Sequence, residues 1–351
     1  MPFNARPLRY DASPGNFRIE VQYMKYRKLG RSGPSVSAIS MGRGSQAIKF
    51  EDEPMVQTFN TTIRRACELG INFFDSSDAY WSTRHEVLLG RAIKGFRDRV
   101  LISSKFGNID LPDGKKGTNG RPEYVYECCD ASLKRMGVDV IDVYYLHRVD
   151  PNVPIEDTVG AMARLIEQGK VRHLGICEAG PATLRRAHRA HPIAALQTEY
   201  SLWFREVERD VLPVCRELGI TYVAYAPLGR GLLTGRIRTV DDLAPNDRRR
   251  RHPRFAPENL ARNVKLVEEL EAMARGQGVT AAQLALAWML AQGDDIVPIP
   301  GTNHVHNLEL NAAAADIRLS PEKVARLSEI FAIGAGAGKR YHANVLKGVG
   351  I

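Results

Sequence analysis

Short runs of apolar residues alternate along the chain with longer segments in which apolar residues recur every three or four positions. The short runs are typical of buried strands, and the longer segments are typical of helices that bury one face. The predicted strands lie within residues 37–42, 72–75, 100–105, 140–146, 171–176, 193–200, 220–227 and 296–300. The predicted helices cover residues 54–69, 86–93, 121–136, 156–168, 181–189, 207–218, 260–275, 281–291 and 304–315, with a last helix that begins at Ser320.

The repeated strand–helix order predicts the fold class. It favours a parallel sheet, because each crossover helix brings the chain back to start the next strand in the same direction. Eight such units predict an α/β fold of the (β/α)8 TIM-barrel type, with a hairpin over residues 24–40 before it and with extra helices and long loops at its C-terminal face. A doubly wound open sheet is the alternative, but no GxGxxG motif follows the first strand.

The chain divides into a short extension and one predicted domain. Residues 1–23 lack hydrophobic periodicity and are expected to form an N-terminal extension. Residues 24–351 are expected to form a single barrel domain, because no shift in composition divides them. The longest interruption of the pattern is the polar segment 235–259, which is rich in Arg, Asp and Pro. We expect it to be a long loop that moves over a bound ligand.

Composition describes an ordinary soluble globular protein, with 44% hydrophobic and 25% charged residues. No apolar run reaches the ~20 residues that a membrane span needs, and the first two dozen residues have no apolar core typical of a secretory signal. Five cysteines without a CxxC pair indicate reduced thiols, and no zinc-ligand spacing occurs among them and the nine histidines. We therefore predict a cytoplasmic protein with no metal and no membrane partner.

The net charge of +9 raises the question of an anionic partner. The densest basic run is residues 248–251, continued by Arg254. No aromatic residue interleaves this run in a stacking pattern, so no nucleic-acid partner is predicted. A solvated loop is the plain interpretation, and steering of an anionic cofactor is the alternative. The sequence leaves the oligomeric state open.

Four polar groups lie at or just after the ends of successive predicted strands: Asp75, Tyr80, Lys105 and His147, here called the tetrad. In a parallel barrel these ends share the face where catalysis takes place. A nearby ammonium favours the phenolate of a tyrosine, whose ordinary pKa is about 10, and makes it a usable proton donor and acceptor. Each residue alone is more often structural. Together they predict protonation of a carbonyl oxygen while hydride arrives at carbon.

Seven segments, in order, resemble members of the aldo-keto reductase superfamily: FFDSSDAY, SSKFG, YYLHRVD, LGICEAG, ALQTEYSL, AYAPLGRGLLTG and IVPIPGTNHVHNLELNAAAA. The resemblance covers roughly residues 24–330 and depends on the order and joint spacing of the segments. The forms LGICEAG, LQTEYSLW and PIPGT, with the basic loop, are similar to a bacterial branch that acts on diverse aldehydes and ketones. The resemblance implies a barrel that binds NADP(H) in extended form without a Rossmann domain.

It also implies the activity and the roles of the tetrad. The expected enzyme is an NADP(H)-dependent oxidoreductase that reduces an aldehyde or ketone to the alcohol, reversibly. Tyr80 would donate the proton in reduction and accept it in oxidation, and Lys105 would lower its pKa. Asp75 would fix the ammonium of Lys105, and His147 would hydrogen-bond the substrate carbonyl and orient it.

The same resemblance implies a set of cofactor contacts. They are Cys177, Glu178, Gln197, Tyr225, Leu228, Gly229, Arg230, Gly301, Thr302, Asn303, Glu309 and Asn311. Among them, Gln197 would bind the nicotinamide carboxamide, Tyr225 would stack on the nicotinamide, and Arg230 would contact the pyrophosphate. Cys177 stands where many members have serine, a better hydrogen-bond donor, so packing is its alternative role.

Asn303 bears on the choice between NADP(H) and NAD(H). Many relatives have Lys or Arg after the PGT turn, whereas Asn303 adds only neutral hydrogen bonds to those of the helix start. We predict NADP(H), with weaker selection against NAD(H) than in those relatives. Trp81, Trp203 and Phe204 are predicted to wall the substrate pocket, and packing at the barrel rim is the alternative for Trp81.

Two other functions are alternatives to carbonyl reduction. Barrels of this type resemble the cytoplasmic β subunits of potassium channels, so an NADP(H)-binding regulatory subunit is the alternative. Lyase or isomerase chemistry on a barrel would leave the tetrad without a role. A small-molecule carbonyl or alcohol substrate remains the leading hypothesis, because the tetrad is intact.

Overall fold

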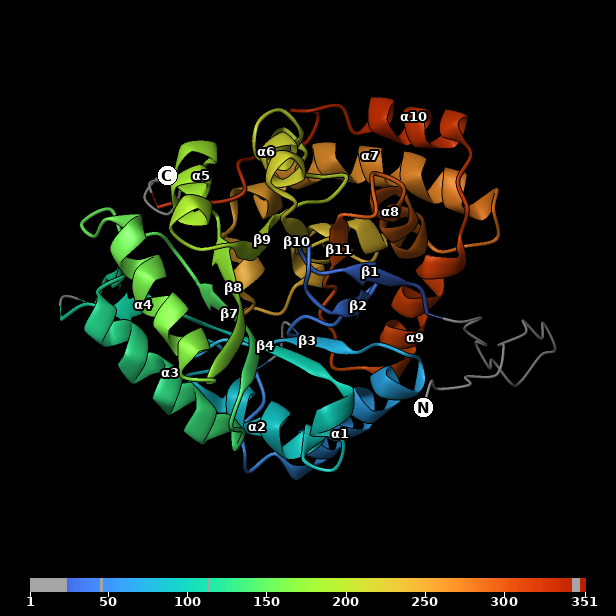
Figure 1. The fold of residues 1–351 in the computed structure, drawn as a ribbon. Helices are drawn as coiled ribbons and strands as arrows, with labels where there is room; N and C mark the ends of the chain where they lie inside the picture. The colour runs from blue at the N-terminus through green and yellow to red at the C-terminus, as the bar shows by residue number, and fades with distance from the viewer. Residues whose placement is uncertain (1–23, 45–46, 113, 343–347) are drawn as a thin grey trace.

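The computed structural model describes residues 24–44, 47–112, 114–342 and 348–351, so the predicted N-terminal extension lies outside the described residues. A parallel sheet of seven strands curls through the centre of this part, in the order β11-β10-β9-β8-β7-β4-β3 (Figure 1). The strands are β3 (Phe73–Asp75), β4 (Leu101–Phe106), β7 (Ile141–Leu146), β8 (Val171–Cys177), β9 (Ile193–Glu199), β10 (Thr221–Tyr225) and β11 (Ile296–Pro298). Consecutive strands are neighbours in the sheet, as β–α–β units produce.

Two short pairings close this sheet into a barrel. Met41 forms a parallel bridge with Phe74 of β3, and Gly42 forms one with Gly301, just after β11. The two backbones lie so close that a Cβ on Gly301 would stand 1.8 Å from the carbonyl oxygen of Arg43. Residues 41–42 therefore take the eighth position, and the predicted (β/α)8 barrel is confirmed.

The predicted first strand, residues 37–42, is too long, because its beginning pairs elsewhere. Ser37 belongs to the predicted hairpin, in which β1 (Tyr26–Lys28) pairs antiparallel with β2 (Ser35–Ser37). Leu29 and Val36 of this hairpin pack with the side chains inside the barrel. The N–H of Gly30 donates to Thr221 Oγ1, at the start of β10, at 2.7 Å. The hairpin thus covers the amino-terminal end of the barrel.

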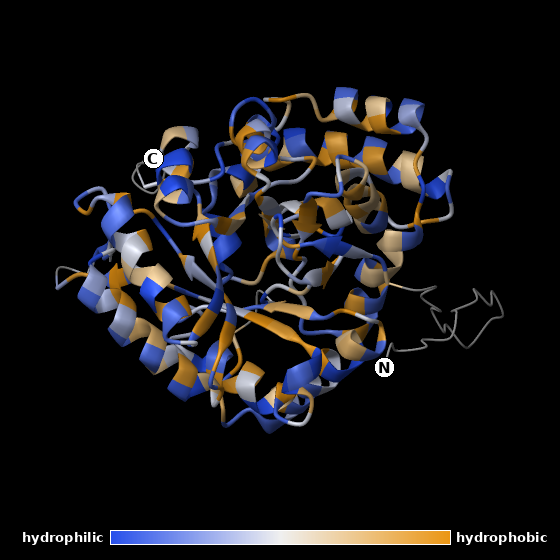
Figure 2. Ribbon diagram, in the orientation of Figure 1, coloured by the Kyte–Doolittle hydropathy of each residue, from blue (hydrophilic) through white to orange (hydrophobic). Residues whose placement is uncertain are grey.

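Helices cover the outside of the sheet and turn apolar residues toward it (Figures 1 and 2). They are α1 (Glu53–Glu68), α2 (Arg84–Ile93), α3 (Pro122–Met136), α4 (Ile155–Glu167), α5 (Pro181–Ala190), α6 (Val211–Leu218), α7 (Pro257–Arg275), α8 (Ala281–Leu290), α9 (Val305–Ala313) and α10 (Pro321–Ile330). Each of them overlaps a helix that the hydrophobic pattern predicts. None of the helices in the described ranges is long and apolar enough to cross a bilayer.

Short elements account for most of the differences from the prediction. The antiparallel pair β5 (Asn108–Asp110) and β6 (Lys116–Thr118) was not predicted, since three exposed or half-exposed residues are too few to show alternation. The 3-10 helices are η1 (Arg97–Arg99), η2 (Glu206–Glu208), η3 (Gly229–Thr234), η4 (Val240–Asp242), η5 (Arg248–Arg251), η6 (Pro253–Phe255) and η7 (Ala314–Asp316). Three of these lie within segment 235–259, which therefore has more local structure than a plain loop.

Candidate active site

Asp75 and Lys105 meet because of the register between β3 and β4. Asp75 is paired with Ser103, and Lys105 lies two residues further along β4. Side chains two residues apart on a strand share a face, so Ser103 and Lys105 both point toward Asp75. Ser103 Oγ donates to Asp75 Oδ1 at 2.9 Å, and Lys105 Nζ donates to Asp75 Oδ2 at 2.5 Å. The carboxylate is thereby held on both oxygens.

The ammonium of Lys105 uses its remaining donors inside the site. Its Nζ donates to the carbonyl oxygen of Ser76 at 2.7 Å and to the hydroxyl oxygen of Tyr80 at 3.2 Å. The side chain is fully buried. Burial disfavours the ammonium, but the neighbouring acidic groups, led by the carboxylate of Asp75, together outweigh this effect and raise the pKa of Lys105. Lys105 is therefore cationic near neutral pH.

The pKa of Tyr80 is raised, which is opposite to the net direction predicted from the sequence. Loss of solvation raises the pKa, and this effect is larger than the lowering by Lys105; Asp75 raises it further, and Arg43 lowers it. Lys105 thus acts in the predicted direction without deciding the outcome. Tyr80 is consequently a neutral phenol near neutral pH, which is the form that donates a proton.

His147 follows β7 and faces Tyr80. The two rings are nearly perpendicular, with 6.0 Å between their centres, and Ser77 Oγ lies 3.2 Å from His147 Nδ1. Burial, assisted by the nearby charges of Arg148 and Lys105, lowers the pKa of His147 well below its ordinary value. The neutral imidazole has one nitrogen that donates a hydrogen bond and one that accepts. All members of the tetrad are thus brought together, while their catalytic roles stay predictions.

Arg43 belongs to the same cluster and was missed by the sequence analysis. Its guanidinium carbon lies 4.7 Å from the centre of the Tyr80 ring and 6.0 Å from that of Trp81. The sequence nevertheless contains a pattern that predicts Arg43 as a site residue. Residues 37–42 were predicted as a barrel strand, so Arg43 follows a strand end just as Tyr80 and His147 do.

Gln197 and Cys177 are paired neighbours on β9 and β8. Gln197 Nε2 donates to Asp75 Oδ1 at 2.8 Å, which ties this predicted carboxamide contact to the tetrad. Cys177 packs among apolar side chains inside the barrel, and burial raises the pKa of its thiol to about 12. This environment favours the packing role for Cys177.

Two residues near the C-terminus hold three of the predicted cofactor contacts. Arg340 donates through both terminal nitrogens to Glu178, at 2.9 and 2.7 Å. The hydroxyl of Tyr225 donates to Glu178 at 2.7 Å and lies 3.0 Å from the hydroxyl of Tyr341. Arg230 donates to the same Tyr341 hydroxyl at 2.7 Å. No sequence signal predicted these contacts, because Arg340 and Tyr341 lie beyond the last periodic helix.

The predicted phosphate loop follows β11 and leads into α9. The hydroxyl of Thr302 accepts a hydrogen bond from the N–H of His304 at 3.0 Å, and Thr62 Oγ1 donates to the carbonyl oxygen of Asn303 at 3.2 Å. A Cβ on Gly44 would stand 2.1 Å from Asn303 Oδ1, so the glycine permits this close approach. The loop is therefore packed directly against segment 41–44.

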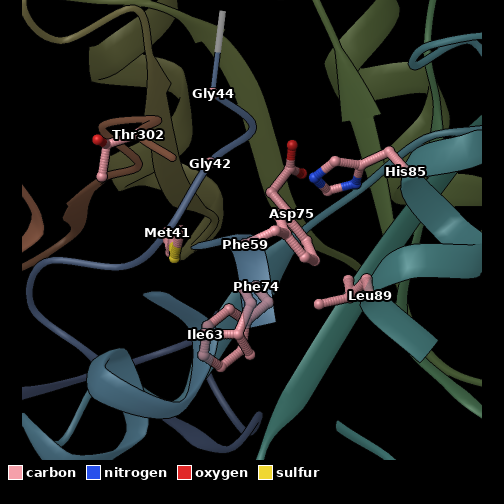
Figure 3. Close-up of a pocket in the computed structure, with 10 residues that line it drawn as sticks. All are labelled: Met41, Gly42, Gly44, Phe59, Ile63, Phe74, Asp75, His85, Leu89 and Thr302. Atoms are coloured by element: carbon pink, nitrogen blue, oxygen red, sulfur yellow. The ribbon is translucent and has the colours of Figure 1, made fainter. Parts of the chain in front are cut away.

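A pocket connects this loop with the tetrad. Figure 3 shows Gly42 and Gly44 between Thr302 and Asp75, and His85 of α2 on the far side of Asp75. The remaining lining is mainly apolar: Met41, Phe59, Ile63, Phe74 and Leu89. Asp75 of the tetrad and Thr302 of the predicted phosphate loop thus line one pocket.

The other predicted cofactor contacts lie on η3 and α9 in varied surroundings. Leu228 and Gly229 lead into η3, where Gly229 has a φ of +57°, a left-handed value that glycine adopts without strain. Glu309 forms an ion pair with Arg65 of α1 at 2.8 Å, and Asn311 is buried on α9. The cofactor-binding roles of Leu228, Gly229, Glu309 and Asn311 therefore stay predictions.

The predicted substrate walls differ in their distance from the tetrad. Trp81 is buried next to Tyr80, and its ring lies edge-on to that of His85, with 4.8 Å between centres. Trp203 packs edge-on against Phe331 at 5.9 Å, and the guanidinium of Arg340 lies over the ring of Phe204 at 4.5 Å. Trp81 therefore borders the tetrad. Trp203 and Phe204 instead contact the C-terminal segment, residues 331–342.

Known proteins of one family match this chain. The profile of the Aldo/keto reductase family matches residues 40–332. "Probable aldo-keto reductase 1" of Glycine max is 44% identical over 318 residues, which cover 90% of this chain and 91% of that protein.

Solved structures agree with this match. An aldo-keto reductase of Klebsiella pneumoniae in complex with NADPH has a TM-score of 0.69 at 27% identity, covering 88% of this chain and 96% of the other. A glycerol dehydrogenase of Gluconobacter oxydans has a TM-score of 0.78 at 23% identity, covering 88% and 95%, and so supports the fold alone. Because the family profile spans most of the barrel and the soybean relative is similar over nearly its whole length, the chain belongs to the aldo/keto reductase family.

Proposed function

We propose that the protein is an NADP(H)-dependent oxidoreductase that reduces an aldehyde or ketone to the alcohol and can run in reverse as an alcohol dehydrogenase. The observation that carries the proposal is the chain of contacts from Asp75 through Lys105 to the hydroxyl of Tyr80. NADP(H) is supported by the Klebsiella pneumoniae relatives, whose structures contain NADPH or NADP.

The residues at the barrel mouth suit such a cofactor. Gly42, Gly44 and Gly301 let segment 41–44 and the loop after β11 pack together, because a Cβ on any of them would clash with protein atoms. Gly42 and Gly44 also line the pocket beside Asp75, where part of an extended ligand could lie. Arg230 Nε is buried without a hydrogen-bond partner among the described residues, as expected of a group that meets a phosphate. When bound, NADPH would supply the hydride that reduces the carbonyl carbon.

The tetrad would supply the proton and the orientation. Tyr80 donates its proton to the carbonyl oxygen, which becomes the alcohol hydroxyl, and the phenolate that remains is stabilised by the ammonium of Lys105 at 3.2 Å. His147, neutral because burial lowers its pKa, donates a hydrogen bond to the same oxygen without contributing charge. In oxidation the phenolate of Tyr80 takes the proton back.

Replacement of Tyr80 by phenylalanine tests the proposal. We expect Tyr80→Phe to lower turnover of aldehydes by about 10²–10⁴-fold, because the phenol is the proposed source of the proton, while the dissociation constant of NADPH stays nearly unchanged. Tyr144→Phe is the matched control, since its buried hydroxyl has no hydrogen-bond partner among the described residues. Loss of NADPH absorbance with a panel of aldehydes and ketones gives the rates.

Two outcomes would contradict the proposal. Turnover by Tyr80→Phe equal to that of the Tyr144→Phe control would remove Tyr80 from the acid role. NADPH binding without turnover of any carbonyl compound by the unmodified protein would instead favour an NADP(H)-binding regulatory subunit.

A further inference from the structure

The tetrad and Arg43 together carry one unbalanced positive charge. Lys105 and Asp75 neutralise one another at 2.5 Å. Tyr80 is a neutral phenol because its pKa is raised, and His147 is a neutral imidazole because its pKa is lowered. Arg43 adds a guanidinium 4.7 Å from the centre of the Tyr80 ring. The local field therefore favours an anion beside the proton donor.

Arg43 lacks the carboxylate partner that its neighbours have. Around the same mouth, Arg254 is paired with Glu199 at 2.5 Å and Arg340 with Glu178 at 2.7 Å. Over the described ranges Arg43 forms no ion pair, and its side-chain hydrogen bond goes to the carbonyl oxygen of its own neighbour Gly44 at 3.2 Å. A partly buried guanidinium of this kind keeps most of its donors for a ligand.

Trp81 provides a second donor without an acceptor in the same place. Its ring centre lies 6.0 Å from the guanidinium carbon of Arg43. Its indole nitrogen is buried and finds no acceptor in the part of the chain that the structure describes. The backbone of Trp81 has a φ of +54°, a left-handed value that is costly for a large side chain and is typical of functional sites. The guanidinium of Arg43 and the indole N–H of Trp81 are thus available to donate hydrogen bonds to an oxygen acceptor next to Tyr80.

We propose that Arg43 binds a carboxylate of the substrate, so that the enzyme prefers aldehydes or ketones that carry a carboxylate near the carbonyl. The inference rests on the proposed function and names a substrate class for it. A planar guanidinium binds a carboxylate through two parallel hydrogen bonds, which fixes its orientation as well as its distance. With the carboxylate on Arg43, the carbonyl of such a substrate is directed toward the hydroxyl of Tyr80.

Two other roles for Arg43 predict different results. If Arg43 held a phosphate of the cofactor, its loss would weaken NADPH binding and affect every substrate equally. If Arg43 acted only by lowering the pKa of Tyr80, its loss would change the pH profile for acidic and neutral substrates alike. Only binding of the substrate carboxylate predicts a loss that is confined to acidic substrates.

The experiment compares matched substrates in matched variants. The acids are 4-carboxybenzaldehyde and succinic semialdehyde, and their neutral counterparts are methyl 4-formylbenzoate and butanal. Arg43→Gln removes the charge, and Arg43→Lys keeps the charge without the planar fork. Arg64→Gln is the control, because it removes an exposed arginine of α1 that has no role in the site. The dissociation constant of NADPH is measured for each protein.

We expect the unmodified protein to favour the acids in kcat/KM, and Arg43→Gln to lower kcat/KM for the acids by about 10- to 100-fold. In Arg43→Gln, kcat/KM for the neutral aldehydes and the dissociation constant of NADPH should change by less than about threefold, and in Arg64→Gln kcat/KM for all four substrates should change by less than that. For the acids, kcat/KM of Arg43→Lys should lie between the values of the unmodified protein and of Arg43→Gln. Equal loss for acids and neutral compounds, weakened NADPH binding, or no preference for acids in the unmodified protein would each overturn the inference. Tyr80-dependent turnover of the neutral aldehydes would leave the proposed function standing in all three cases.

Discussion

Loss of solvation and two nearby cations act on Tyr80 in opposite directions, and the loss of solvation prevails. This balance keeps the phenol protonated, as reduction requires, but it makes the phenolate, which is the base for oxidation, costly to form. Lys105 lowers the cost of forming that phenolate in both directions. The effect of the lysine should therefore be visible in a pH profile rather than in a single rate.

Replacement of Lys105 by methionine should move the pH profile of alcohol oxidation. Without the ammonium the pKa of Tyr80 rises further, so the rate should climb only at a more alkaline pH than in the unmodified protein. Lys94→Met, at an exposed position that ends α2, is the control. A lower rate with an unmoved profile would mean that Lys105 acts through packing and not through charge.

The tetrad could be predicted from the sequence because each member lies at a strand end, and strand ends share a face in a parallel barrel. Arg43 follows the same rule, since it comes directly after the predicted strand 37–42. The contacts of Arg340 and Tyr341 with Glu178 and Tyr225 are of another kind. They join positions far apart in the chain without any periodic pattern, so only the folded backbone reveals them.

At the scale of helices and strands, the hydrophobic pattern located every long helix because each buries one face against the sheet. The pattern did not locate very short strands, and it misplaced the start of the segment that closes the barrel. Strand 37–42 was predicted too long, since Ser37 pairs in the hairpin and pairing with the barrel starts at Ser40, whose N–H donates to the carbonyl oxygen of Pro298. The close approach at Gly301 follows from packing between distant segments, which local sequence does not encode.

Two glycines within helices should respond to alanine in opposite ways. A Cβ on Gly90 of α2 would stand 2.0 Å from the carbonyl oxygen of Met136, at the end of α3, so Gly90→Ala should lower the free energy of unfolding by about 1–3 kcal/mol. Gly160 of α4 is exposed with nothing within 4 Å of such a Cβ, so Gly160→Ala should raise it by about 0.5–1 kcal/mol. Denaturant unfolding of both variants measures the difference. Equal effects would mean that α2 and α3 can separate without cost.

Over the whole molecule, the C-terminal segment and segment 235–259 form one cover on the barrel mouth. His252 Nδ1 lies 3.3 Å from the carbonyl oxygen of Arg340, and His342 Nε2 lies 2.6 Å from that of Arg251. Arg254 reaches below the cover to Glu199 at 2.5 Å. A ligand that displaces one of these segments therefore disturbs the other.

Hydrogen exchange with and without NADPH should show this coupling. We expect amide protection in residues 235–259 and 332–342 to change together when NADPH binds, while helix α4 on the outside of the barrel stays unchanged. A change in one segment alone would show that the contacts between them do not couple their motion. Equal protection in both states would mean that segment 235–259 is a fixed loop, contrary to the sequence-based expectation.

The hairpin of β1 and β2 has a kinetic consequence. The hairpin covers the amino-terminal end, with Leu29 and Val36 packed among the side chains that fill the barrel, so ligands reach the tetrad only from the carboxyl ends of the strands. A cofactor and a substrate that meet at the tetrad therefore share one side of approach. The ligand that lies closer to the barrel has to bind first and leave last, so the order of binding depends on geometry and not only on affinity.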